Sequence, residues 1–419
     1  MGIWLVPQDE LTVDQLRGVQ LPIDGHKLIY GPPGSGKTLA LVHRARHLFD
    51  RYGIAPDRLR LFVYTRSLRD YILSALNLLR IPSECILGFD AWCRSYYTQH
   101  IAARVPWDSN NRTPDFAAIR KEVLSSLESG NDAVKYDCVL VDEGHDLDDI
   151  SFRILQKIGR HVTVCMDSKQ QIYDSGITEG EVLAILGLRN RSVSLLEAYR
   201  CCPYIVKLAA TFLQDDKERQ YYLAQTKVVQ GEREKPLLAV ARSQPEELAL
   251  LVDKLGTRQL LGDRIAILFP SRRQVYGYAN ALREAGFEVE VPKEFGGKGS
   301  KYIPLDFNSD LPKLMPYHSA KGLTFDTIFM PRLLDSCFRH SSDERIRSLL
   351  FVGITRATKW VYIGTDESQI LPQLKMLFAP SSSEYLSVQY ARNVGGATMA
   401  EDDGEEETEV DDDLSNLFS

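Results

Sequence analysis

The chain has 419 residues, 44% of them hydrophobic and 26% charged, which is the composition of a soluble globular protein of two or three domains. It has neither a run of about 18 apolar residues nor a signal-peptide pattern, so we expect a cytoplasmic protein without a membrane span. Its seven cysteines are scattered and form no C-x-x-C pair, which favours reduced thiols over disulfides or zinc ligands.

The acidic residues are concentrated near the C-terminus. The formal net charge is −7, yet residues 401–413 alone contain ten of the 57 acids. The rest of the chain, with 50 basic and 47 acidic residues, has a net charge of +3. This weakly basic body permits a nucleic-acid groove but does not argue for one.

Residues 31–38 form a glycine-rich segment, Gly-Pro-Pro-Gly-Ser-Gly-Lys-Thr, that fits the phosphate-loop pattern G-x-x-x-x-G-K-[ST]. In such loops backbone N–H groups surround a triphosphate, the lysine reaches the outer phosphates and the hydroxyl binds Mg²⁺. Residues 27–30 predict a buried strand and residues 38–49 an amphipathic helix, which is the context the motif requires. The predicted phosphate-binding residues are Gly31, Gly34, Ser35, Gly36, Lys37 and Thr38.

Alternating strand and helix patterns continue along the first half of the chain. A short helix is predicted near 11–17, strands at 59–65, 137–143 and 161–167, and helices at 67–79 and 150–159. Residues 101–135 carry two prolines and a glycine and are predicted to be a small surface insertion. Strands and helices that alternate at this spacing predict a parallel sheet with helices on both faces.

The pattern restarts at residue 192 without a second phosphate loop. Strands are predicted at 192–196, 236–241, 264–269, 313–317, 327–330 and 360–364, and helices at 205–213, 245–255, 273–285 and 345–358. We therefore predict an N-terminal α/β domain over 1–191, a second α/β domain over 192–385, and a disordered acidic tail over 386–419.

Asp142 and Glu143 follow the apolar run 137–141. Phosphoryl transfer to water needs Mg²⁺, a carboxylate that holds it, a base that orients the water, and positive charge near the phosphate oxygens. Asp142 suits the metal together with Thr38, and Glu143 suits the water. Two acids that merely cap a strand end are the structural alternative.

These residues and several later segments, in the same order, resemble the UvrD/Rep-like branch of superfamily 1 helicases over residues 11–365. The resemblance implies two tandem RecA-like domains with parallel sheets and a P-loop NTPase fold. The matching segments are Gln15, 31–38, 64–67 (Tyr-Thr-Arg-Ser), 89–92 (Phe-Asp-Ala-Trp), 141–146 (Val-Asp-Glu-Gly-His-Asp), 167–173, 198–200 (Ala-Tyr-Arg), 318–323 and 352–357.

The resemblance implies an ATP site that both domains complete. Gln15 would read adenine and Tyr199 would stack on it. Gly322, in the segment 318–323, would also contact the ATP. ATP with Mg²⁺ would hold the domains closed, and hydrolysis would let them part. The implied catalytic residues are Lys37, Glu143, Gln170, Arg200 and Arg356.

The resemblance also implies a path for single-stranded DNA, with RNA as the alternative. The implied contacts are Thr65, Arg66, Phe89, Trp92, Tyr173, His318 and Ser319. In this branch a tryptophan usually follows the segment that matches 167–173, and here it is missing, since Asp174 follows Tyr173. Tyr64, Phe89, Trp92 or Tyr173 would stack on bases instead, and core packing is the alternative for each. His145 stands where this branch usually has glutamine, and either side chain can hydrogen-bond.

Two functional hypotheses follow. The leading one is an ATP-dependent translocase or helicase on single-stranded DNA, moving 3′ to 5′ by resemblance. Only about fifty residues separate Trp92 from Asp142, so large accessory domains are not expected. This compact form favours the second hypothesis, a nucleic-acid-sensing ATPase subunit that switches or loads a partner without unwinding.

The acidic tail ends in apolar residues, from Asp411 to Phe418. Single-strand-binding proteins have similar tips that dock on partners, so the segment is a candidate docking peptide. The same acids could instead fold back over a basic groove, or remain a solvated, inert run.

Overall fold

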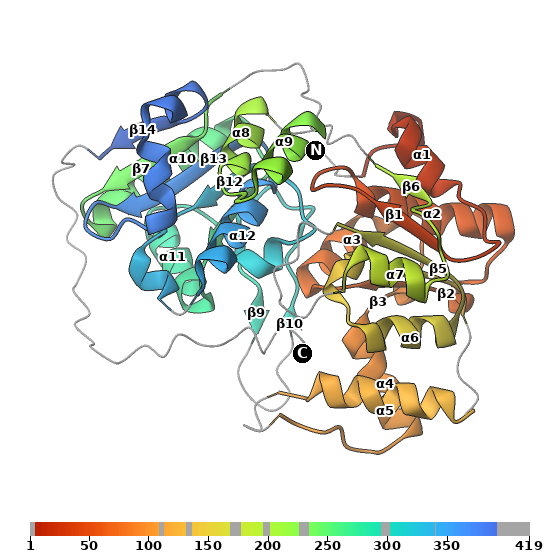
Figure 1. The fold of residues 1–419 in the computed structure, drawn as a ribbon. Coiled ribbons are helices and arrows are strands. Elements are labelled where there is room, and N and C mark those ends of the chain that lie inside the picture. Colours follow the sequence, from red (N-terminus) through yellow and green to blue (C-terminus); the bar gives the residue numbers. More distant parts are fainter. Residues whose placement is uncertain are drawn as a thin grey trace. The chain divides into compact units, whose positions relative to one another are not determined.

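The computed structural model describes residues 5–108, 113–130, 136–167, 177–195, 202–225, 234–294, 302–339 and 341–391. The chain divides into two units, one containing the described residues up to 195 and the other those from 202 to 391. Each unit is built on one six-stranded parallel sheet (Figure 1). The predicted α/β class with two parallel sheets is therefore confirmed.

In the first unit the strand order is β3-β2-β4-β5-β1-β6, and every neighbouring pair is parallel. The strands are β1 (Lys27–Tyr30), β2 (Leu59–Val63), β3 (Ile86–Gly88), β4 (Tyr136–Val141), β5 (Gly159–Met166) and β6 (Val193–Ser194). The helices are α1 (Val13–Val19), α2 (Lys37–Tyr52), α3 (Arg66–Leu79), α4 (Phe89–His100), α5 (Phe116–Glu128), α6 (Asp149–Ile158) and α7 (Glu179–Ile185).

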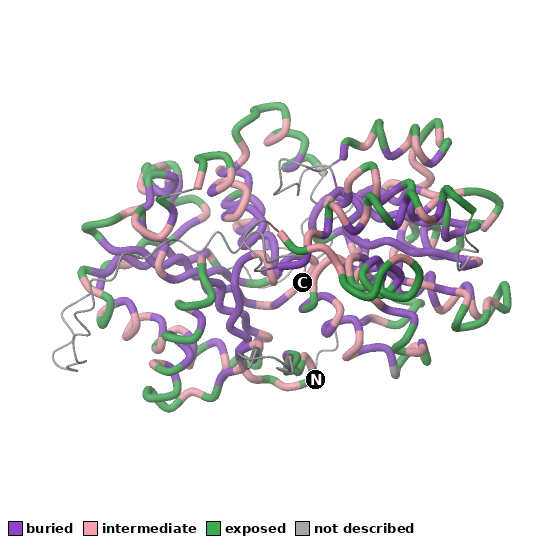
Figure 2. The backbone as a smooth tube through the Cα atoms, turned by 90° about the horizontal axis from the view of Figure 1, so that it is seen from below, coloured by how far each residue is buried: buried purple, intermediate pink, exposed green. Residues whose placement is uncertain are grey.

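The central strands of this sheet are buried over nearly their whole length, as expected for parallel strands covered on both faces. Figure 2 shows the extended stretches of the backbone tube as mainly purple, that is, buried, and several coiled stretches as mainly green, that is, exposed. Register pairs Tyr30 with Met166, and Val141 with Val164. The carboxyl ends of β1, β4 and β5 therefore meet at one edge, where the chemistry of such sheets is usually found.

Helix α5 departs from the prediction of a surface insertion over 101–135. It begins at Asp115, whose side chain accepts a 2.9 Å hydrogen bond from the Ala118 N–H, and it packs between α4 and α6. Figure 1 shows α4 and α5 side by side. Its buried residues Phe116, Ile119, Val123 and Leu127 belong to the main core of this unit, so the expectation of a surface segment is wrong for residues 116–128.

Strand β6 also departs from the prediction, because it belongs to the first sheet and not to the second. It pairs in parallel with β1, joining Ile29 to Val193 and Tyr30 to Ser194. The first unit thus extends beyond the expected boundary at residue 191. A two-residue strand has too short a pattern to indicate which sheet it joins.

The second unit has the strand order β11-β8-β12-β13-β7-β14, again entirely parallel. The strands are β7 (Leu237–Ala241), β8 (Ile265–Phe269), β11 (Lys313–Pro316), β12 (Phe325–Met330), β13 (Ala357–Asp366) and β14 (Ser387–Tyr390), with an antiparallel pair β9 (Lys293–Glu294) and β10 (Tyr302–Ile303) outside the sheet. The helices are α8 (Pro203–Ala210), α9 (Asp216–Gln225), α10 (Gln244–Leu260), α11 (Arg272–Glu284) and α12 (Asp343–Ile354).

Strand β14 shortens the predicted tail. Residues 386–419 were expected to be a disordered segment, yet Ser387–Tyr390 pairs in parallel with β7 and forms an edge of the second sheet. Among the strands that the structure describes, β7 is its only neighbour, and Val388 and Tyr390 are exposed. Because the strand is mostly exposed, its sequence Ser-Val-Gln-Tyr does not contain the apolar run that predicts a buried parallel strand.

The described helices include none that combines the length and apolar character needed to cross a membrane. The six cysteines in the described ranges are free thiols, five of them buried. Residues 411–418, the candidate docking peptide, lie outside the described residues.

Candidate functional site

The phosphate loop connects β1 to α2 and needs glycine at its last turn. Gly36 has φ +80° and caps the N-terminus of α2, and Gly34 has φ +74°, both in the left-handed region that favours glycine. A Cβ at Gly36 would also stand 2.3 Å from Nε2 of Gln15. The loop therefore depends on the absence of a side chain at residue 36.

Gln15 lies against this loop. Its Nε2 donates to the carbonyl of Ser35 at 2.9 Å, and its Oε1 accepts from the N–H of Thr12 at 3.1 Å. The Thr12 hydroxyl in turn accepts from the N–H of Gln15, which makes a capping box at the start of α1. The cap holds the buried glutamine next to the loop.

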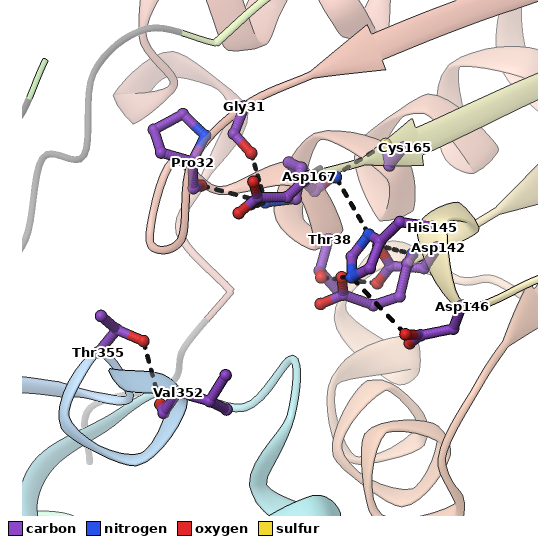
Figure 3. Close-up of polar contacts among 12 residues, drawn as sticks. Gly31, Pro32, Thr38, Asp142, His145, Asp146, Cys165, Asp167, Val352 and Thr355 are labelled. Atoms are coloured by element: carbon purple, nitrogen blue, oxygen red, sulfur yellow. Dashed lines mark hydrogen bonds and ion pairs between the residues drawn. The ribbon is translucent and has the colours of Figure 1, made fainter. Parts of the chain in front are cut away.

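Lys37 extends into the loop that precedes it. Its ammonium donates to the carbonyls of Gly31 at 2.8 Å and Pro32 at 3.1 Å, and it lies 3.9 Å from Oδ2 of Asp167 (Figure 3). The side chain is buried. The positive charge predicted for the outer phosphates is thus held inside the loop.

Thr38 and Asp142 meet at the carboxyl edge of the sheet. The Thr38 hydroxyl donates to Oδ2 of Asp142 at 2.6 Å, and Oδ1 of Asp142 accepts from the N–H of Glu143 at 3.1 Å. Burial, followed by repulsion from the Glu143 carboxylate, raises the pKa of Asp142 above its usual range. A bound cation would reverse this penalty, because it stabilises the ionised carboxylate.

The oxygen atoms at this edge fit Mg²⁺. A hydroxyl and a carboxylate are ligand types that Mg²⁺ prefers, and it usually takes few from the protein itself. Two further buried polar atoms at the edge, Ser35 Oγ and Glu143 Oε2, have no hydrogen-bond partner among the described residues. Such buried atoms suit a bound ligand or ordered water.

Glu143 begins a sharp turn after β4. It adopts φ +52° and ψ +43°, a left-handed conformation that is uncommon for glutamate, and is followed by the 3₁₀ turn η4 (Gly144–Asp146). Its side chain is buried, and Oε2 lies 3.4 Å from Nε2 of His145. The carboxylate thus lies beside the predicted metal ligand and against an imidazole.

The predicted DNA contacts in the first unit divide into two groups. The Thr65 hydroxyl accepts from the Leu68 N–H at 3.1 Å and caps α3, with Arg66 exposed beside it. Phe89 and Trp92 are buried in the core, and Trp92 Nε1 donates to the Tyr136 hydroxyl at 3.0 Å. For these two aromatics the structure favours the core interpretation over a base-stacking platform.

In the second unit, His318 and Ser319 lie half-buried in the turn η5 (Tyr317–Ala320) that follows β11. Gly322 has φ +78°. The buried Arg356 donates through Nε to the Val352 carbonyl at 3.0 Å and through Nη1 to the Leu323 carbonyl at 3.4 Å. The structure therefore brings the predicted segments 318–323 and 352–357 together.

Four predicted site residues lie outside the described residues: Gln170, Tyr173, Tyr199 and Arg200. Asp167, the first residue of the matching segment 167–173, was not among the predicted site residues, yet it is fully buried 3.9 Å from the Lys37 ammonium. The signal that points to it is its place directly after β5, which matches the place of Asp142 after β4.

Comparison with known proteins supports the resemblance for the first part of the chain. Residues 11–134 match the family model of the UvrD/REP helicase N-terminal domain. Among solved structures, the chain is similar to the C-terminal domain of a possible DNA helicase from Lactobacillus plantarum WCFS1, at 16% identity over 45% of this chain and 98% of that chain, with a TM-score of 0.32. That likeness is too loose to bear on function, and no curated protein matches the sequence.

Proposed function

We propose that this chain, whose residues 11–134 match the model of the UvrD/REP helicase N-terminal domain, is an ATP-dependent translocase or helicase on single-stranded DNA. The observation that carries the proposal is the hydrogen bond between Thr38 and Asp142 beside the Lys37 ammonium. It joins the phosphate loop to the acid after β4, and this pairing of groups is the one that nucleoside triphosphate hydrolysis uses.

In the proposed reaction Gly31, Gly34, Ser35 and Gly36 bind the phosphates and Lys37 reaches the outer ones. Thr38 and Asp142 would hold Mg²⁺, which when bound neutralises charge on the β- and γ-phosphate oxygens. Glu143 would orient the attacking water and accept its proton. These roles are supported by the burial of Glu143 and Asp142 at one sheet edge.

The second unit would contribute Arg356 and, from outside the described residues, Arg200, which would stabilise charge on the γ-phosphate. Gln170 would sense that phosphate, and Gln15, Tyr199 and Gly322 would bind the nucleoside side. Thr65, Arg66, His318 and Ser319, together with Tyr173, would contact single-stranded DNA. The 3′-to-5′ polarity rests on family resemblance alone, and the free thiols of the described cysteines suit a reducing cytoplasm.

A partial-duplex experiment tests the proposal. The purified protein is given ATP, Mg²⁺ and duplexes with a 3′ or a 5′ single-stranded tail, and both strand displacement and ATP hydrolysis are measured, with DNA and RNA strands. Displacement of the 3′-tailed duplex supports the helicase. Stimulated hydrolysis without displacement or translocation supports the alternative, a nucleic-acid-sensing ATPase that acts on a partner.

A Lys37→Ala variant is the control for contaminating ATPase. Hydrolysis that no nucleic acid stimulates would contradict both functions.

A further inference from the structure

His145 lies between two strand ends of the candidate site, in the turn η4 after β4, and is fully buried. Its Nδ1 accepts a 3.1 Å hydrogen bond from the backbone N–H of Asp167, directly after β5. Its Nε2 lies 3.4 Å from Oε2 of Glu143 and 3.8 Å from Oδ1 of Asp146. Figure 3 shows the ring between Asp167 and Asp146.

The hydrogen bond from Asp167 selects one form of the ring. A nitrogen that accepts an N–H bond carries no proton, so Nδ1 is the bare nitrogen and the neutral ring has its proton on Nε2. That proton faces the carboxylates of Glu143 and Asp146. The imidazole therefore accepts from the backbone N–H of Asp167 and directs its own N–H toward Glu143, 3.4 Å away.

The position of the His145 ring depends on close packing of the turn η4 against β5. A Cβ at Gly144 would stand 2.4 Å from Cγ1 of Val164, so η4 lies directly on β5 only because residue 144 has no side chain. This contact brings His145 within reach of the Asp167 N–H. A larger residue at 144 would push the turn away from β5.

Glu143 needs such a restraint. Its backbone is in a left-handed conformation, and its Oε2 has no hydrogen-bond partner among the described residues. The 3.4 Å separation from His145 exceeds a normal hydrogen bond, and catalytic contacts of this kind often shorten when substrate binds. A water-orienting carboxylate must be held within about 0.5 Å of its working position.

We infer that His145 is a positioning residue that orients the Glu143 carboxylate and ties it to the backbone of Asp167. This inference rests on the proposed function, in which Glu143 orients the attacking water. Asp167 immediately precedes the segment predicted to sense the γ-phosphate. A movement of that segment would therefore be passed through the imidazole to Glu143.

Three substitutions separate the two contacts of the ring. His145→Ala removes both. In His145→Gln the amide reaches the position of Nε2 and keeps a donor for Glu143. In His145→Asn the amide oxygen takes the position of Nδ1 and keeps the acceptor for Asp167.

We expect His145→Ala to lower kcat about 10–100-fold, the usual effect of removing a group that orients a catalytic ligand. The KM for ATP and the affinity for a fluorescent ATP analogue should change less than about threefold, because the ring lies against Glu143, Asp146 and the backbone of Asp167. His145→Gln should restore most of kcat, whereas His145→Asn should restore the melting temperature but not kcat. In a Glu143→Gln background, His145→Ala should cause no further loss.

Two results would overturn the inference. One is a kcat for His145→Ala within about threefold of wild type in a protein that melts normally. The other is an equal fall in kcat for His145→Gln and His145→Asn that parallels their loss of melting temperature. A purely structural role of the ring predicts that pattern.

The ring itself can be observed without turnover. With ¹⁵N-labelled histidine at pH 7.5, the imidazole signal that His145→Gln removes should report a neutral ring with its proton on Nε2. A ring protonated on Nδ1 would exclude the bridge to Asp167. Should the wild-type protein hydrolyse no ATP, the proposed function fails, and this spectrum still decides whether the bridge exists.

Discussion

The Thr38 hydroxyl and Oδ2 of Asp142 lie 2.6 Å apart although 104 residues separate them in the chain. One belongs to the first turn of α2 and the other follows β4. The parallel register of the sheet brings these two elements to the same edge. The two oxygens proposed to hold Mg²⁺ are therefore already side by side.

Removing the hydroxyl should weaken the response to Mg²⁺. We expect Thr38→Val to lower apparent Mg²⁺ affinity or ATPase activity about 10–100-fold, because valine has a similar shape but no oxygen. The matched control is Thr38→Ser, which keeps the hydroxyl and should stay within a fewfold of wild type. ATP hydrolysis measured across a Mg²⁺ titration, with EDTA as the metal-free reference, checks both. Equal Mg²⁺ curves for the valine and serine variants would contradict the assignment.

Lys37→Ala and Glu143→Gln should both abolish turnover, for different reasons. The first removes the ammonium that the loop carbonyls hold, so ATP binding and hydrolysis should both be lost. The second keeps the shape of the side chain but removes its basicity, so hydrolysis should be lost while nucleotide binding remains. Binding of a fluorescent ATP analogue and phosphate release distinguish the two. An active Glu143→Gln protein would refute the proposed role of Glu143.

Stability should fall in acid because of His161. Its Nε2 accepts from Arg44 at 2.9 Å, and burial, followed by the charge of Arg44, lowers the pKa of His161 to about 3. The unfolded chain, with a histidine pKa near 6.5, binds the proton more tightly, so stability is fully present above pH 6.5 and is lost as the pH falls toward 3. The expected loss from this residue is about 2 kcal/mol at pH 5.

Denaturation curves at pH 7 and pH 5 measure this loss. His26 and His43, whose pKa values burial also lowers, act in the same direction, so a variant is needed to isolate His161. His161→Gln keeps an oxygen that accepts from Arg44 and has no proton to gain. Its stability should depend less on pH than that of wild type. Parallel curves for the two proteins would exclude His161 as the source.

A substitution of Trp92 distinguishes a role in core packing from a role in DNA binding. Trp92→Phe removes the hydrogen bond to Tyr136 and part of the buried ring, so the free energy of unfolding should fall by about 1–3 kcal/mol. Affinity for a labelled oligonucleotide should stay within about twofold. Arg66→Ala, at an exposed position, should show the opposite pattern. Weaker DNA binding by Trp92→Phe at unchanged stability would restore the base-stacking interpretation.

The parts of the fold that sequence predicts best are those whose signals are local. Residues 27–30 and the helix after the phosphate loop were expected within a few residues, because an apolar run, a glycine pattern and an amphipathic period adjoin one another. The pairing of β6 with β1 and of β14 with β7 depends on distant partners, so two and four residues of pattern did not indicate it.

The candidate site follows the same division. Lys37, Thr38, Asp142 and Glu143 were identified because each stands at the end of a strand or the start of a helix with a recognisable pattern. The proposed role of His145 between Glu143 and Asp167 depends on a contact between the turn after β4 and the residue after β5. The spacing of these residues along the chain does not indicate that contact.

The pairing of β6 with β1 also has a mechanical consequence. The Leu195 N–H donates to the Tyr30 carbonyl at 2.7 Å, and a Cβ at Gly31 would stand 3.0 Å from both the Cβ and the carbonyl oxygen of Leu195. The last described residue of the first unit therefore lies against the first residue of the predicted phosphate loop. A displacement of Leu195 would therefore act directly on β1 and on Gly31, where the phosphates are proposed to bind.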